Sequence, residues 1–152
     1  MRRVLAVLVC SACTASMPAA VSTAPGAGVS GTVLGKGSSR DGVEVRNDGP
    51  TDVVIRRIVI APGGSTGWHY HPGRLIAVVL KGTLTRILED CSVQTTPQGQ
   101  SIVEDSGARH VHIGRNLGTD DVELLVTYVI PAGAPLAIDA ASPSCPLPTA
   151  GR

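Results

Sequence analysis

The residues of this sequence that could do chemistry together are its histidines, which fall in two pairs. The chain has only four histidines, and they are His69 and His71, and His110 and His112. In a β-strand, residues i and i+2 point to the same face about 6–7 Å apart, so each pair would present two imidazoles on one side. Neutral imidazole binds divalent transition metals. The pairs therefore predict a metal site whose third ligand comes from a distant segment; the metal could be Fe, Mn, Ni, Cu or Zn.

Strands must position these histidines, and strand-like runs alternate with turn residues from position 31 onward. Gly, Pro, Asn and Asp separate the runs, because they adopt the backbone angles that tight turns require. No window shows the 3.6-residue periodicity of an amphipathic helix. We therefore predict an all-β sandwich or barrel in one domain. The predicted strands are residues 32–34, 43–46, 52–60, 66–71, 75–81, 84–88, 101–104, 108–113 and 122–130.

The first residues have the order of a secretory signal peptide. Arg2 and Arg3 precede an apolar run, and small residues follow, which is typical of a cleaved leader. The run is too short to span a bilayer. We expect a signal peptide at residues 1–26 and a secreted or extracytoplasmic protein. Cys10 and Cys13 lack the preceding residues of a lipoprotein site, so lipid anchoring is the less favoured reading.

Two cysteines remain after such a cleavage, Cys91 and Cys145. In an oxidising compartment they could form a disulfide, and two free thiols are the alternative. The bond would tie a Pro-rich C-terminal tail, residues 141–152, to the domain at residues 27–140. A formal net charge of +1 without a basic stripe argues against nucleic acid as a partner.

Two segments resemble the motifs of the cupin family. The segment from Gly63 through His69 and His71 to Gly82 resembles the first motif, and residues 99–116 resemble the second. The resemblance covers roughly residues 50–131 and implies a small single-domain protein with a cupin-type jelly-roll β-barrel. It also implies a metal held by His69, His71 and the histidine of the second motif.

The second motif leaves the third ligand open. Counting back from Asn116 selects His112, whereas counting forward from Gly107 selects His110. Both histidines have the same strand parity, so both could face inward. We favour His112 and keep His110 as the alternative.

One departure from the family pattern changes the expected chemistry. The family's glutamate ligand has no counterpart, because position 75 is Leu. We expect no carboxylate to replace it, since Glu89, Asp90, Glu104 and Asp105 lie in other segments. Three neutral imidazoles would leave the metal charge uncompensated and its Lewis acidity high. Such a site resembles the three-histidine iron sites of thiol and diketone dioxygenases. Candidate substrate-pocket residues are Arg74, Leu75 and Tyr128.

Three functions follow as hypotheses. The first is a metal-dependent oxygenase or related enzyme that acts on a small acid. The second is a non-catalytic extracytoplasmic module that binds a small molecule or a metal, and the third is a structural barrel. Residues 75–80 are apolar on both faces, which predicts a cover on the outer face. A second subunit in a homodimer would supply that cover, and the chain's own N-terminal strands are the alternative.

Overall fold

The computed structural model describes residues 29–149 of the chain. The chain divides into two units, residues 1–32 and 33–152. Of the first unit only residues 29–32 are described, and they contain no strand. The predicted signal peptide, residues 1–26, lies outside the described residues.

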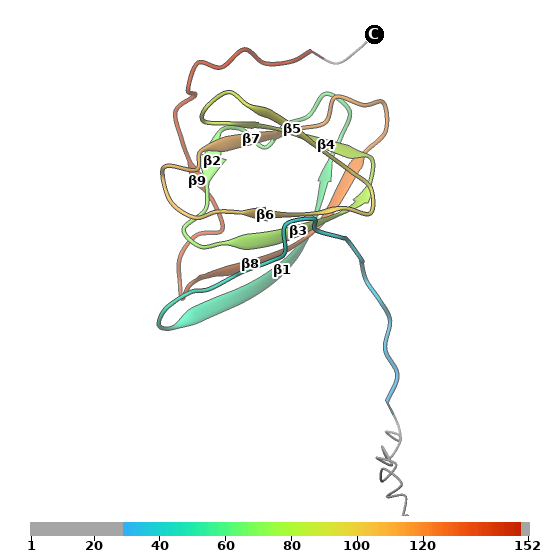
Figure 1. Ribbon diagram of the computed structural model, residues 1–152, viewed down its shortest axis with the longest axis vertical. Coiled ribbons are helices and arrows are strands. Elements are labelled where there is room, and N and C mark those ends of the chain that lie inside the picture. Colours follow the sequence, from blue (N-terminus) through green and yellow to red (C-terminus); the bar gives the residue numbers. More distant parts are fainter. Residues whose placement is uncertain (1–28, 150–152) are drawn as a thin grey trace, which may run out of the picture. The chain divides into compact units, whose positions relative to one another are not determined.

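Strands are the only regular elements in the described residues, so the all-β prediction is confirmed (Figure 1). Within residues 29–149, accordingly, no helix is long and apolar enough to cross a membrane. The strands are β1 (Thr51–Ile60), β2 (His69–Tyr70), β3 (Leu75–Lys81), β4 (Thr83–Leu88), β5 (Val93–Pro97), β6 (Ser101–Glu104), β7 (His112–Arg115), β8 (Val122–Pro131) and β9 (Ile138–Asp139).

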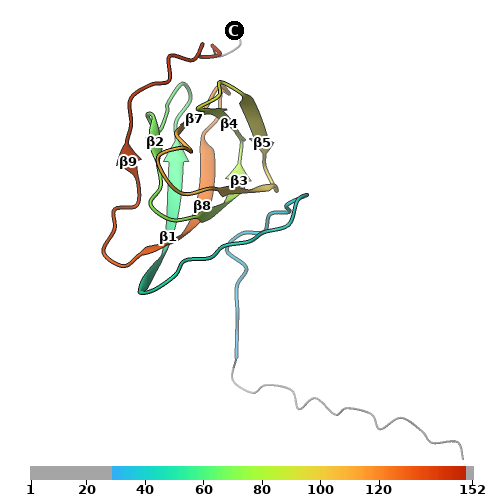
Figure 2. The same ribbon diagram turned by 60° about the vertical axis from the view of Figure 1, so that its left-hand side comes forward.

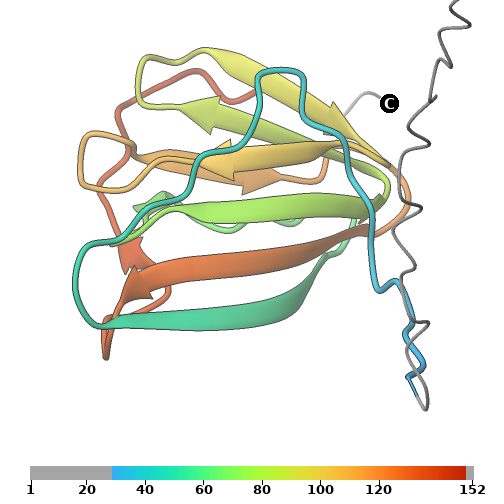
Figure 3. The same cartoon turned by 60° about the horizontal axis from the view of Figure 1, so that its bottom comes forward.

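The strands form two sheets that face each other (Figures 1 and 2). One sheet has the order β1-β8-β3-β6, and the other has the order β5-β4-β7-β2-β9. Figure 3 shows β1, β8 and β3 side by side in the first sheet. All pairings between these strands are antiparallel. The order brings strands that are distant in sequence together, which places β2 beside both β7 and β9.

The hydrophobic core lies between the sheets and follows the two-residue period of β3 and β8. Leu75, Ala77 and Val79 of β3 are buried, and alternate residues of β8 from Val122 to Ile130 are buried beside them. Aliphatic side chains fill most of this core, as expected for a chain without Phe. The inner faces of β3 and β8 therefore lie against the space that holds the histidines.

The outer face of β3 is covered in part by the chain's own N-terminal segment. Gly35 packs so closely on it that a Cβ would lie 2.7 Å from the Cδ2 atom of Leu80 and 3.3 Å from that of Leu125. Ser38 then forms a parallel bridge with Gln100 at the start of β6. This segment accounts for much of the two-sided apolarity of β3 without a second subunit.

The strand prediction is wrong in several places, and the strand predicted at 66–71 is reduced to β2 at His69–Tyr70. Residues 32–34 and 43–46 form no strand, and the short β5 and β9 were not predicted. The strand predicted at 108–113 begins only at His112, because the His110 amide donates to the Gly107 carbonyl in a turn. This turn takes His110 out of the strand.

The predicted disulfide between Cys91 and Cys145 is present. It joins the segment after β4 to the C-terminal tail. Arg115 of β7 also donates a hydrogen bond of 2.6 Å to the Pro148 carbonyl. The tail is thereby fastened along the sheet that carries the histidines.

Candidate metal centre

Three histidines meet between the sheets, and they come from two neighbouring strands. His69 of β2 is the direct cross-strand partner of His112 of β7, and His71 follows β2 immediately. All three side chains are buried, and their ligand atoms lie within 4.8 Å of one another. His110 is exposed and stays outside this cluster. The structure therefore brings His69, His71 and His112 together and leaves the alternative ligand at the surface.

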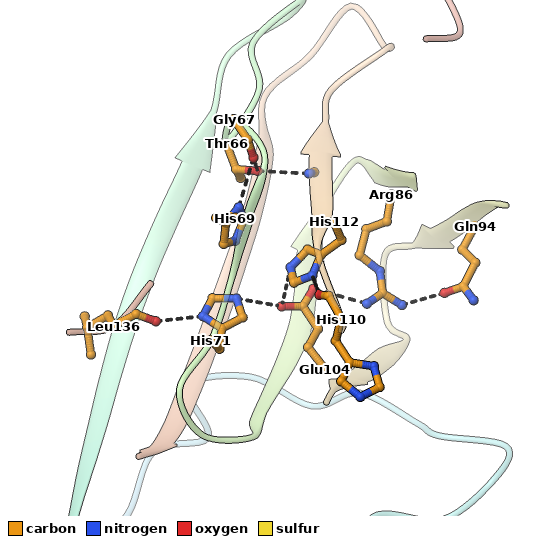
Figure 4. A network of polar contacts seen from close by, with 11 residues as sticks. Thr66, Gly67, His69, His71, Arg86, Gln94, Glu104, His110, His112 and Leu136 are labelled. Carbon is orange, nitrogen blue, oxygen red and sulfur yellow. Dashed lines mark hydrogen bonds and ion pairs between the residues drawn. The ribbon is translucent and has the colours of Figure 1, made fainter. Parts of the chain in front are cut away.

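Each imidazole is held by a backbone carbonyl at its Nδ1 atom (Figure 4). His69 contacts the Gly67 carbonyl at 2.9 Å, and His112 contacts the carbonyl of His110 at 2.9 Å. His71 contacts the Leu136 carbonyl, in the segment before β9, at 2.6 Å. A carbonyl only accepts, so Nδ1 carries the proton of each neutral ring. The Nε2 lone pairs are left free, which is how proteins orient imidazole toward a metal.

A carboxylate lies beside this cluster, contrary to the expectation from sequence. Oε2 of Glu104, in β6, is 3.1 Å from Nε2 of His71 and 3.1 Å from Nε2 of His112. Glu104 is the cross-strand partner of Leu75 in the β3–β6 pair. Glu104 is distant from the histidines along the chain, and the register of β6 against β3 brings it to them. The sequence carries no local signal for this pairing, because β4 and β5 lie between the two strands.

The residues present fit a divalent metal. The buried Nε2 atoms of His71 and His112 make no hydrogen bond, although a carboxylate oxygen lies near both of them. With the protons on Nδ1, two lone pairs face an anionic oxygen. That arrangement is favourable only when a positive charge, a metal ion or an added proton, lies between them.

The charges of the site shift the pKa values of its members in opposite directions. Burial alone would raise the pKa of the Glu104 carboxyl, but His112, His71 and the charge of Arg86 hold that pKa well below its usual range. Burial lowers the pKa of His69. Burial also opposes a charge on His112, yet the contact with Glu104 outweighs it and raises the pKa of His112.

Arg86 of β4 fixes the other oxygen of the carboxylate. Its guanidinium donates to Oε1 of Glu104 at 3.1 Å and to Oε1 of Gln94 at 2.7 Å. Arg86 is 7% exposed, and its Nε–H has no hydrogen-bond partner among residues 29–149. A buried cation thus neutralises one face of Glu104, while the histidines lie on the other.

Two cavities meet at the site. An inner cavity of about 50 Å³ has apolar walls, and an outer cavity of about 270 Å³ reaches the same centre from the side of β4 and β6. Arg86, Glu104 and His112 line both cavities, and His110 lines only the outer one.

The predicted substrate-pocket residues separate into two groups. Leu75 and Tyr128 line the inner cavity, and the Tyr128 ring centroid is 5.7 Å from that of His71. Arg74 lies outside it, pairs with Asp105 at 2.7 Å and donates to the Glu44 carbonyl. Arg86 and Glu104 line the cavity and were not among the predicted site residues.

Comparison with known proteins gives a family match and several similar folds. Residues 56–128 match the family model described as the cupin domain, and this range includes the three clustered histidines and Glu104. An uncharacterized conserved protein with a double-stranded β-helix domain from Klebsiella pneumoniae is 23% identical, with a TM-score of 0.50 over 64% of this chain and 91% of that chain.

Two further structures match with lower TM-scores. A conserved protein of unknown function from Streptococcus pyogenes is 23% identical, with a TM-score of 0.47 over 54% of this chain and 68% of that chain. A predicted oxalate decarboxylase from Thermotoga maritima is 27% identical, with a TM-score of 0.45 over 51% of this chain and 65% of that chain. No curated protein matches the sequence.

Proposed function

We propose that this chain, whose residues 56–128 match the cupin domain, is a cupin and a metal-dependent enzyme of the oxygenase type or a related kind, acting on a small acid. The observation that carries this proposal is the convergence of three buried Nε2 lone pairs from His69, His71 and His112. A bound transition ion would supply Lewis acidity and, where it is redox-active, electron transfer.

The walls of the site support a small acidic substrate. The inner cavity, whose lining includes Leu75 and Tyr128, is mostly apolar and has room for only a few atoms. The outer cavity gives a small molecule a route to the same centre. An approaching carboxylate would meet the positive charge of Arg86, which lines both cavities.

Metal analysis combined with a matched pair of histidine variants tests this function. Protein purified without affinity tags or chelators should contain about one equivalent of a divalent metal and consume O₂ with a small chelating acid. His112→Ala should lose both the metal and the O₂ consumption, whereas His110→Ala should keep the metal, because the exposed His110 side chain lies outside the histidine cluster. Retention of the metal by His112→Ala would show that the site is assigned wrongly.

The alternative is a non-catalytic extracytoplasmic module for a small molecule or a metal. The small size of the inner cavity is the observation that favours it, because a bound ion and one ligand would fill that space. This module would bind metal and gain thermal stability with a small acid, yet no product would form and no O₂ would be consumed.

We also propose export and a homodimer. Arg2 and Arg3 before an apolar run support export, and so does the disulfide, a bond typical of oxidising compartments. N-terminal sequencing of the exported protein should place the cleavage between Ala20 and Ala27. The exposed side chains of Val53, Ile55 and Val59 on edge strand β1 support pairing with a second copy, which light scattering can measure.

A further inference from the structure

We propose that Glu104 is a ligand of the metal and does, from β6, what the family's glutamate does from the position of Leu75 in β3. This inference rests on the proposed metal site and concerns its ligand set. The sequence departs from the cupin pattern at Leu75, and the structure restores a carboxylate to the same place from the neighbouring strand.

The register of the two strands makes this exchange possible. Leu75 and Glu104 are directly opposite each other in the antiparallel β3–β6 pair, and such partners have their Cβ atoms about 5 Å apart on the same face of the sheet. Both side chains accordingly line the inner cavity. A carboxylate moved from one partner to the other stays beside the same histidines.

The distances around Glu104 match those of neighbouring ligands on one ion. Metal–ligand bonds to His and Glu are about 2.0–2.2 Å, so two ligands at a right angle are roughly 2.8–3.1 Å apart. Oε2 of Glu104 is 3.1 Å from Nε2 of His71 and of His112. Figure 4 shows both contacts converging on the Glu104 carboxylate.

The other oxygen of the Glu104 carboxylate is held in place by a neighbouring side chain. Oε1 accepts from Arg86, and Arg86 in turn donates to Gln94. Oε2 takes no hydrogen bond from the histidines, because their Nε2 atoms have no partner. Glu104 would therefore bind through one oxygen and balance part of the metal charge that three neutral imidazoles leave uncompensated.

The first test measures metal affinity, with Co²⁺ and Mn²⁺ as probes and a competing chelator. Glu104→Gln keeps the size of the side chain and an oxygen for Arg86, so it should fold like the wild type. We expect its affinity to fall by about 100-fold or more, which is at least the effect of losing a group that supports a ligand, and the visible spectrum of bound Co²⁺ to change. Asp105→Asn is the matched control, because Asp105 lines only the outer cavity and pairs with Arg74 rather than with the histidines, and it should bind the metal like the wild type.

The second test returns the carboxylate to β3. The double variant Leu75→Glu with Glu104→Gln should regain most of the affinity that Glu104→Gln alone loses. Wild-type affinity in Glu104→Gln, with the three histidines still required, would overturn this inference and leave the proposed function intact. A wild-type protein that binds neither ion would overturn both. Should Glu104→Gln fail to fold, recovery of folding and affinity in the double variant supports the inference, and recovery of folding without affinity overturns it.

Discussion

The two sides of the metal centre are held in different ways. On the histidine side, each ring is fixed by a backbone carbonyl, from Gly67, Leu136 or His110. On the carboxylate side, Glu104 is held by the side chain of Arg86, which in turn donates to Gln94. A backbone anchor is neutral and survives most substitutions, whereas a buried charge depends on its partner. We therefore expect the histidines to lose their positions when a strand or the tail moves. We expect the carboxylate side to be destabilised when one charge is removed.

Removing the disulfide tests the Leu136 carbonyl, which holds a histidine from a distant segment. Its removal should have the largest effect on stability. Leu136 belongs to the segment that β9 and the Cys91–Cys145 bond fasten to the domain. Replacing both cysteines by Ser should lower the free energy of unfolding by about 4 kcal/mol, because the long loop between Cys91 and Cys145 is then no longer closed in the unfolded chain. It should also weaken metal binding by about tenfold or more, since His71 loses a firmly placed carbonyl.

Urea unfolding in EDTA measures the first effect and chelator competition the second. Reductant should shift the wild-type midpoint toward that of the double Ser variant and leave the variant unchanged. Metal affinity that is unaffected by the loss of the bond would show that the tail does not position His71.

Removal of the cation tests the carboxylate side. Arg86→Met would leave Glu104 buried without its main counter-charge, and breaking a buried pair in this way costs about 3 kcal/mol or more. In EDTA the unfolding midpoint of Arg86→Met should therefore lie below that of the wild type, and bound metal should restore part of the lost stability. The double variant Arg86→Met with Glu104→Gln should recover much of the stability, because no unpaired charge remains. A double variant as unstable as Arg86→Met alone would contradict the charge argument.

The same contrast explains what could be predicted from the sequence. The His-x-His spacing and the turn residues indicate the strands, and they led to two of the three clustered histidines without ambiguity. Counting back from Asn116 favoured His112 over His110, and the structure adds the turn at residues 107–110, which delays the start of β7 and leaves His110 exposed. Glu104 could not be inferred from local spacing, because its place depends on the register of β6 against β3. Periodicity indicates where strands lie, but it does not show which residues of two paired strands are opposite each other.

We expect a smaller effect on stability from changing Thr66, a side chain that supports the histidine side. The Thr66 hydroxyl accepts from the Gly114 amide at 2.9 Å and donates to the Gly67 carbonyl, the group that holds His69. Thr66→Val leaves the buried Gly114 amide without a partner, which costs about 1–2 kcal/mol. Metal affinity should change little, because the Gly67 carbonyl remains. Thermal unfolding of Thr66→Val and of the control Thr66→Ser, which keeps the hydroxyl, measures the difference. Equal losses in both variants would assign the effect to packing.

The smallest expected effect is the pH dependence of the stability of the metal-free protein. The carboxylate and the histidine contribute to it in opposite directions. Glu104 has a lowered pKa in the folded protein, so its contribution to stability is complete above the ordinary carboxyl pKa of 4.5 and is lost as the pH falls through the folded value. His112 has a raised pKa, so its contribution is complete below the ordinary imidazole pKa of 6.5 and is lost as the pH rises through the folded value.

In EDTA the stability that this pair contributes should therefore be greatest between about pH 4.5 and 6.5. The decline on the alkaline side should disappear when a metal is bound, because the ion replaces the proton between Glu104 and His112. Urea midpoints measured across this range with and without metal test the prediction. Glu104→Gln should remove the contribution of this pair from both limbs of the metal-free profile, since neither group then shifts the other. If the variant keeps the wild-type profile, the pH dependence arises elsewhere and the two sides of the centre are not coupled by charge.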